Sequence, residues 1–210
     1  MGRQSNTAQR RGEIVAGLLA ELAAVGYERA STKSIARRAG LAPGLVHYHF
    51  RNKQDILLEL VDGLIADADR RCNDALAAGD DPLARLSAFV TSRLSLGATS
   101  DARVVKAWVS VMAESLGQPK VRARLAKWFA GDHNRIERLF AEAGVAAAGE
   151  HAAMLLSMIL GTFSLRAIGV SEVPQGYAEA RALEYLKLTC APVRRATRDR
   201  PVGARQANSK

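Results

Sequence analysis

The chain has 210 residues, of which 48% are apolar, and only six are proline. This composition allows a sizeable core and favours helices over disorder. No run of about 18 uninterrupted apolar residues predicts a membrane span, and no apolar segment near the start predicts a secretory signal. Two cysteines without CxxC spacing are expected to be reduced thiols, so we expect a cytoplasmic protein.

The net charge of +9 is concentrated at the two ends of the chain. Residues 1–53 carry nine Lys/Arg against three Asp/Glu, and residues 191–210 carry six against one. The middle, 54–190, is close to neutral, with 15 against 17. Basic ends indicate a polyanion partner, most often a nucleic acid, although the charge of the tail could also serve solubility alone.

Apolar residues recur at intervals of three and four along the chain, and no long segment alternates at a period of two, so we predict an all-α fold. Ser31 and Asn52 are expected to cap helices, and Pro43 suits the first position of another. Gly26 and Gly40 are expected to end helices. About nine helices are predicted, at 10–25, 32–39, 43–50, 53–79, 83–97, 102–117, 119–143, 149–168 and 176–189.

Two short helices joined at Gly40 predict a helix-turn-helix. Val46 and Phe50, four residues apart, would face inward on the second helix, which leaves the rest of its surface outward. There, side chains could contact phosphates and base edges, and helix starts with nearby cations attract anions. The predicted DNA-binding residues are Thr32, Lys33, Pro43, Gly44, Leu45, His47, Tyr48 and Lys53.

Other interpretations of these side chains are open. His47 and His49 could bind a metal, but residues two apart on a helix point to different faces, so no metal site is predicted. Tyr48 could be a half-buried core aromatic. Arg37 and Arg38 could be no more than a solvated helix face.

The segment "GYERASTKSIARRAGLAPGLVHYHFRNKQDIL", residues 26–57, resembles the DNA-binding region of TetR-family transcriptional regulators. The resemblance implies an N-terminal three-helix DNA-binding domain joined to a larger helical domain for ligand binding and dimerisation. We therefore divide the chain into a helix-turn-helix domain at 1–53, a ligand-binding and dimerisation domain at 54–190, and a basic tail at 191–210 whose composition predicts disorder.

Two positions depart from the family pattern. His47 stands where the family often has a tyrosine, so its reach is shorter and its charge can change near neutral pH. Ala42 stands where the family often has a serine N-cap, and losing that hydrogen bond costs about 1 kcal/mol of helix stability.

The C-terminal part, including "KAWVSVMAESLGQPKVRARL" and "GTFSLRAIG", is similar to the BetI-like branch of the family, whose best-known member responds to choline. A small ligand between helices is expected to contact some of Trp108, Met112, Trp128, Phe129, His133, Met154 and Phe163. Helix 149–168 is apolar nearly all round and must be buried. The resemblance implies a four-helix dimer interface there, with candidates Leu155, Leu156, Ile159, Leu160 and Phe163.

These features predict a homodimeric regulator that binds a double-stranded DNA operator, acts as a repressor, and is released by an unknown small-molecule effector. No cofactor and no catalytic residue is predicted, because the sequence has no nucleophile elbow, phosphate-cradling glycine loop or HExxH motif. The alternatives are a nonspecific nucleic-acid-binding protein and an all-helical enzyme.

Overall fold

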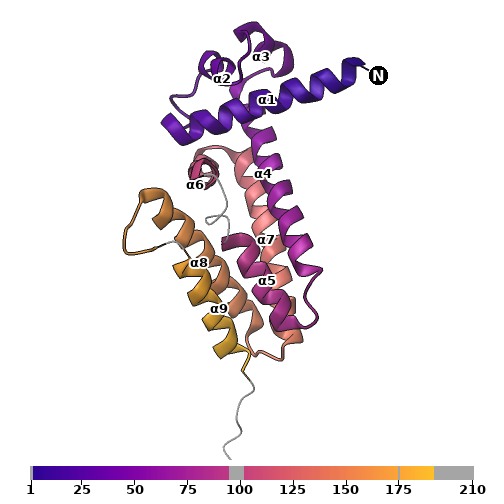
Figure 1. Cartoon of the computed structure of the whole chain (residues 1–210), viewed down its shortest axis with the longest axis vertical. Coiled ribbons are helices and arrows are strands. Elements are labelled where there is room, and N and C mark those ends of the chain that lie inside the picture. The colour runs from indigo at the N-terminus through magenta and orange to yellow at the C-terminus, as the bar shows by residue number, and fades with distance from the viewer. Residues whose placement is uncertain (1, 95–101, 175, 192–210) are drawn as a thin grey trace, which may run out of the picture.

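The computed structural model describes residues 2–94, 102–174 and 176–191. Throughout these residues the regular structure is α-helical, as predicted (Figure 1). The helices are α1 (Gly2–Val25), α2 (Thr32–Arg38), α3 (Pro43–His49), α4 (Lys53–Leu76), α5 (Pro82–Leu94), α6 (Ala102–Gly117), α7 (Pro119–Glu142), α8 (Ala148–Ile168) and α9 (Tyr177–Thr189). The predicted tail from 192 and the predicted helical residues 95–97 lie outside the described part.

Local signals in the sequence explain where the short helices begin and end. The Ser31 side chain accepts from the backbone N–H of Ser34, and the Ser34 hydroxyl accepts from the N–H of Ser31, both at 3.0 Å. This reciprocal capping box starts α2. Gly40 follows with φ +67°, a conformation that favours glycine, and turns the chain toward α3. Asn52 caps α4 by accepting from the N–H of Asp55 at 2.8 Å.

The first helix is longer than predicted, because it begins at Gly2 and not near Arg10. Its early turns carry no apolar stripe, so the periodicity that marks the rest of α1 could not reveal them. Polar pairs support this stretch instead. Both Gln9 and Arg10 donate to the carboxylate of Glu13, at 3.0 and 2.7 Å.

Helices α1 to α3 form a head that packs on the body through a continuous core. This head core runs from Ile14 in α1 through the first part of α4 to Trp108 and Val111 in α6 and Leu125 in α7. A second core, the body core, joins α5, α8 and α9 to the far ends of α4 and α7. Figure 1 shows α6 directly beneath α1, and α4 running from the head down the body. The predicted domain boundary at residue 53 therefore does not mark a break in packing.

Helix α8 has a large exposed apolar face. By length and composition alone it could cross a membrane, with a mean hydropathy of 1.4 over its best window, a possibility that the search for uninterrupted apolar runs did not reveal. Leu155 packs inside the body core, whereas Met154, Leu165 and Ile168 are 52%, 41% and 76% exposed. The outward face therefore lies uncovered in the single chain.

Candidate nucleic-acid interface and internal cavity

Helix α3 presents one face to the head core and the other to solvent. Val46 and Phe50 are buried, as predicted. Pro43, Gly44, Leu45, His47 and Tyr48 are all exposed, and Tyr48, at 78%, is no half-buried core aromatic. The helix begins without a side-chain cap at Ala42, as the sequence predicted. The arrangement leaves short polar and apolar side chains free to contact an external partner.

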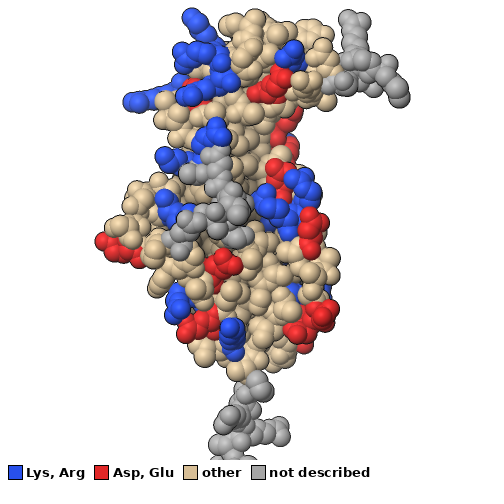
Figure 2. All heavy atoms as spheres, in the orientation of Figure 1, with Lys and Arg blue, Asp and Glu red and all other residues tan. Residues whose placement is uncertain are grey.

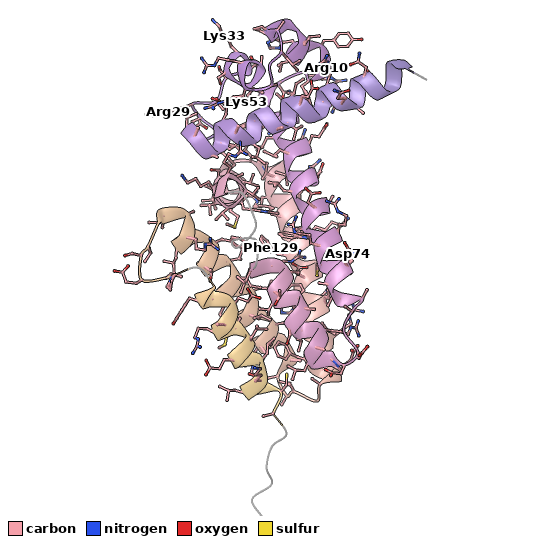
Figure 3. All side chains as sticks on the ribbon, viewed as in Figure 1. Arg10, Arg29, Lys33, Lys53, Asp74 and Phe129 are labelled. Atoms are coloured by element: carbon pink, nitrogen blue, oxygen red, sulfur yellow. The ribbon has the colours of Figure 1, made fainter. Side chains whose placement is uncertain are left out.

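The start of α2 lies beside this exposed face. The Thr32 hydroxyl is 3.4 Å from His47 Nε2, which brings residues from both helices together. Lys33 and Arg37 are exposed and border a shallow hollow that Pro43 also lines. Figure 3 labels Lys33 on this side of the head, and Figure 2 shows Lys and Arg gathered there. A basic surface next to an exposed helix suits a nucleic-acid backbone.

Lys53 occupies a different position from the one expected of a phosphate ligand. Its ammonium donates to the carbonyls of Tyr27 and Ala30, at 2.8 and 2.9 Å, and lies 4.1 Å from the centre of the Tyr27 ring. Two of its three N–H groups are thus used inside the head. Lys53 holds the turn between α1 and α2 against the start of α4, so at most one N–H remains for a phosphate.

Two arginines of the head reach from the surface to groups on neighbouring helices. Arg38 donates to the buried carboxylate of Glu21 at 2.7 Å, and this hydrogen bond lowers the pKa of Glu21. Arg11 lies over the Phe50 ring, pairs with Glu59 and donates to the carbonyl of His49 at 2.6 Å. These two arginines fasten the helices of the head to one another. Sequence reasoning missed Arg11, since nothing local in α1 indicates its partners.

A second hollow lies between the beginning of α1 and α3. It is lined by Asn6, Thr7 and Arg10 from α1 and by Leu45 and Tyr48 from α3, together with His49. The early turns of α1 were not predicted to be helical, so this neighbourhood could not be found from the sequence. It extends the exposed polar surface of the head along α1.

An enclosed cavity lies in the body, between the head core and the body core. Five of the seven predicted pocket residues line it: Trp108, Met112, Trp128, Phe129 and Phe163. Trp108 and Trp128 are stacked, with ring centres 4.9 Å apart and planes at 15°. The cavity is small, about 20 Å³ for the centres of water-sized spheres, which is space for one or two water molecules.

Two predicted pocket residues lie elsewhere. His133 points toward the start of α8, where its Nε2 is 3.1 Å from the carbonyl of Gly149, and its ring also neighbours Glu137. Met154 is 52% exposed on the outer face of α8. Each sits on the expected helix, but its rotation about that helix turns it away from the cavity.

The residues predicted for a subunit interface on α8 mostly face inward. Leu155 and Ile159 are buried in the body core, so they are not available to a partner. Leu156, Ile159, Leu160 and Phe163 line the cavity. Leu156, Leu160 and Phe163 are half-buried, and their place in a subunit interface stays a prediction. Because α8 is apolar nearly all round, its sequence pattern does not reveal which face is covered.

A buried ion-pair network that the sequence did not reveal borders the cavity. Arg93 of α5 is 3% exposed and donates to both carboxylate oxygens of Asp132 of α7, at 3.1 and 2.8 Å. It also donates to the carbonyl of Ala68 at 2.6 Å and to Asp69 at 3.2 Å, both on α4. The indole N–H of Trp128 donates to the same carboxylate of Asp69 at 2.9 Å.

The two charges of this network affect each other's titration. Burial raises the pKa of Asp132, and the hydrogen bonds from Arg93 oppose that rise. Burial would lower the pKa of the Arg93 guanidinium, but its hydrogen bonds and charge pairing with Asp132 outweigh this effect and raise it. Arg93 therefore stays charged, and the network joins α4, α5 and α7 through one cation.

Two family models match the chain over most of its length. Residues 14–60 match "Bacterial regulatory proteins, tetR family", and residues 82–191 match "BetI-type transcriptional repressor, C-terminal". The first match covers the second half of α1, all of α2 and α3, and the start of α4. The second covers α5 to α9, which carry the described lining residues of the cavity apart from Ala68 of α4.

Curated relatives include two proteins named HTH-type transcriptional regulator BetI. The protein from Cronobacter sakazakii is 32% identical over 119 residues, which cover 53% of this chain and 56% of that protein. The protein from Yersinia pestis is 30% identical over 114 residues, covering 53% and 57%. The chain thus matches little more than half the length of these relatives. Both are named as regulators, which agrees with the prediction of a regulator and not an enzyme.

Solved structures share the fold. A transcriptional regulator from a Rhodococcus species has a TM-score of 0.75 at 23% identity, over 85% of this chain and 95% of its own. A regulator from Saccharomonospora viridis, solved in complex with choline, has a TM-score of 0.74 at 24% identity, over 86% and 96%. With both family models matched and the helical order shared, the chain belongs to the TetR family of bacterial regulatory proteins, with a BetI-type C-terminal region.

Proposed function

We propose that the protein is a sequence-specific DNA-binding regulator, a homodimeric repressor that a small molecule releases from its operator. The observation that carries this proposal is α3, whose Val46 and Phe50 are buried while Leu45, His47 and Tyr48 are exposed beside the basic start of α2. A helix held this way can enter a major groove. In this proposal residues 1–53 bind DNA, residues 54–190 bind the effector and the second subunit, and the protein acts in the cytoplasm.

Within the proposed DNA interface, different side chains contact the phosphates and the bases. Thr32, Lys33 and Tyr48 are assigned mainly to phosphates, and Leu45 and His47 to bases. Lys53 has a mainly structural role, because two of its N–H groups donate to the carbonyls of Tyr27 and Ala30. Pro43 and Gly44 start α3 and let its backbone approach the groove closely.

Capture of genomic fragments by the pure protein, followed by binding assays at physiological salt, tests the DNA-binding assignment. Tyr48→Phe should weaken binding to all sequences alike, because it removes one phosphate donor. Leu45→Ala should alter the preferred bases, since apolar contacts read thymine methyl groups. Equal affinity for operator and random DNA at physiological salt would favour a nonspecific nucleic-acid-binding protein instead.

The homodimer is supported by the uncovered face of α8 and its continuation on α9. Met154, Leu165 and Ile168 of α8 and Tyr177 and Leu188 of α9 are large apolar side chains that the single chain leaves exposed. One short recognition helix is too small to specify a genomic site, whereas a twofold dimer presents two. A near-palindromic operator is expected.

Sedimentation of matched variants tests this interface. Ile168→Glu should shift the protein toward monomer at micromolar concentration and weaken operator binding. Leu116→Glu is the control, because Leu116 is equally exposed, at 81%, but lies at the end of α6. If wild-type protein is only monomeric, or if both variants remain dimeric, the α8 interface is wrong.

Effector release is proposed from the position of the cavity between the two cores. Since α4 contributes to both cores, a ligand that moves the cavity walls can move the head. The Saccharomonospora regulator was solved in complex with choline, so choline is one ligand to test against this cavity. Coupling between such sites is typically about 1–3 kcal/mol, or roughly 5- to 150-fold in affinity.

Linkage gives the test of this mechanism. If the effector lowers the affinity for operator by a given factor, the operator must lower the affinity for effector by the same factor. Effector titrations with and without operator DNA measure both directions. Equal effector affinities in the two titrations would contradict release by this route.

A further inference from the structure

Resting on the proposed effector role of the cavity, we propose that the cavity takes an uncharged, mainly apolar ligand with one hydrogen-bond acceptor, and that it excludes quaternary ammonium cations. The ligand class follows from three features of the cavity as the described residues form it: an internal cation on its aromatic wall, no free carboxylate among the described lining residues, and a buried indole N–H without an acceptor among them.

The first feature is that Arg93 already occupies the place of a cationic ligand. Its guanidinium carbon lies over the Trp128 ring, 5.0 Å from the ring centre, and over the Phe89 ring at 5.2 Å. Trp128 also stacks on Trp108. Trp128 thus already has an internal cation over its ring and an indole stacked on it, and aromatic faces are what quaternary ammonium sites use.

The second feature is that the carboxylates of Asp132 and Asp69 already accept hydrogen bonds from protein side chains. Both oxygens of Asp132 accept from Arg93, and Asp69 accepts from Arg93 and from Trp128. A cation entering the cavity would meet the charge of Arg93, and no described lining residue offers a free carboxylate to compensate it. An anion would have to compete with Asp132 and Asp69 for Arg93, which already makes four hydrogen bonds. Only an uncharged ligand avoids both costs.

The third feature is the Nε1–H of Trp108. Trp108 lines the cavity and is 4% exposed, and its Nε1 is buried without a hydrogen-bond partner among the described residues. Buried N–H groups are normally paired, so an unpaired one at a cavity wall favours an occupant with an acceptor. The remaining walls, such as Met112 and Phe163, are apolar and suit the rest of such a ligand.

The small size of the cavity adds a consequence for binding. Space for one or two waters cannot hold even a benzene ring, so an occupant must push the walls apart. Trp108 belongs to the head core, whereas Ile159 opposite belongs to the body core. A ligand therefore cannot occupy the cavity without separating the head core from the body core.

Calorimetric titration of the DNA-free dimer with three probes tests the ligand class. Acetophenone carries a carbonyl acceptor, ethylbenzene has nearly the same shape without one, and choline is the quaternary ammonium. We expect acetophenone to bind about five- to tenfold more tightly than ethylbenzene, and choline to show no binding at the same concentrations. Choline binding as tight as that of acetophenone, or no acetophenone binding, overturns the proposal.

Two variants assign the effect to named side chains. Trp108→Phe keeps an aromatic wall but loses the N–H, so the preference for acetophenone over ethylbenzene should disappear. Arg93→Met frees Trp128 and Asp132 and should create choline binding, which would appear as a rise in melting temperature with added choline. Arg85→Met is the control on the same helix, because the ion pair that Arg85 makes among the described residues is with exposed Glu142.

The outcomes separate this proposal from the proposed function. Persistence of the acetophenone preference in Trp108→Phe overturns the role of the indole N–H, and no gain of choline binding in Arg93→Met overturns the role of the internal cation. Both readouts are made without DNA. Operator release is measured separately, so acetophenone binding that leaves operator affinity unchanged contradicts effector release and leaves the ligand class standing.

Discussion

Replacing Gly17 with alanine should destabilise the head, because the added methyl group would meet the backbone of α2. A Cβ at this position would lie 2.7 Å from the carbonyl oxygen of Ile35 and 3.3 Å from the backbone nitrogen of Ala39. Neither atom can swing aside as a flexible side chain can. Helix α2 would have to move by several tenths of an ångström away from α1.

The expected magnitude combines two opposing effects. Overpacking of this kind costs about 1–3 kcal/mol. Removing a glycine from a helix interior returns about 0.5–1 kcal/mol. The net loss of unfolding free energy therefore lies between about 0 and 2.5 kcal/mol, and the middle of the two ranges gives about 1 kcal/mol. DNA affinity should fall as well, because the displaced α2 carries the residues beside α3.

Gly12→Ala provides the matched control on the same helix. A Cβ at Gly12 meets nothing within 4 Å, so only the helix-propensity gain remains and the variant should be about 0.5–1 kcal/mol more stable. Guanidinium chloride unfolding followed by circular dichroism measures both variants. Should Gly17→Ala prove as stable as Gly12→Ala, the close approach of α1 and α2 cannot be as described.

Three further predictions concern the head. Lys33→Ala should weaken binding to every DNA sequence and lower the salt dependence by about 1 per subunit, whereas Lys106→Ala on α6 should change neither. Ser31→Ala should cost about 1 kcal/mol in denaturant unfolding through loss of the α2 cap, and no loss would contradict the capping box. Glu21→Gln should reduce the acid sensitivity of the protein. Because Arg38 lowers the pKa of Glu21 from its ordinary 4.5, the pair stabilises the fold above that pH and the contribution is lost as pH falls through the lowered value. Melting temperatures at pH 7 and pH 3 check this, and a variant with the wild-type pH dependence would disprove it.

The sequence predicted most of the helices because their ends carry local signals. Ser31, Gly40 and Asn52 are residues whose own chemistry starts or stops a helix, and the structure confirms each one. The early turns of α1 were missed, since polar pairs stabilise them without an apolar stripe. The exposed residues of α3 could be predicted because Val46 and Phe50 fix the inward face of a helix that is only two turns long.

The cavity could be predicted only in part. Large aromatic residues such as Trp108 and Trp128 mark a helical core in the sequence, but not how each helix is rotated, which is why His133 and Met154 were misplaced. Arg93 and Asp132 are 39 positions apart, and each looks like one polar residue on an amphipathic helix. Their pairing depends on how α5 and α7 pack together, and no local sequence pattern indicates that packing.

The head core, with its contribution from α6, also limits how this protein can be re-engineered. Residues 1–53 fused to the body of another regulator would lose the wall that Trp108 and Val111 of α6 form in this core. A functional chimera would therefore need a recipient whose α6 presents a complementary apolar face, or the transfer of that face together with the head. Ancestral recombination that joined the head of one regulator to the body of another would have met the same requirement for a matching α6. Complementarity at α6 therefore limits which recombinants could have folded.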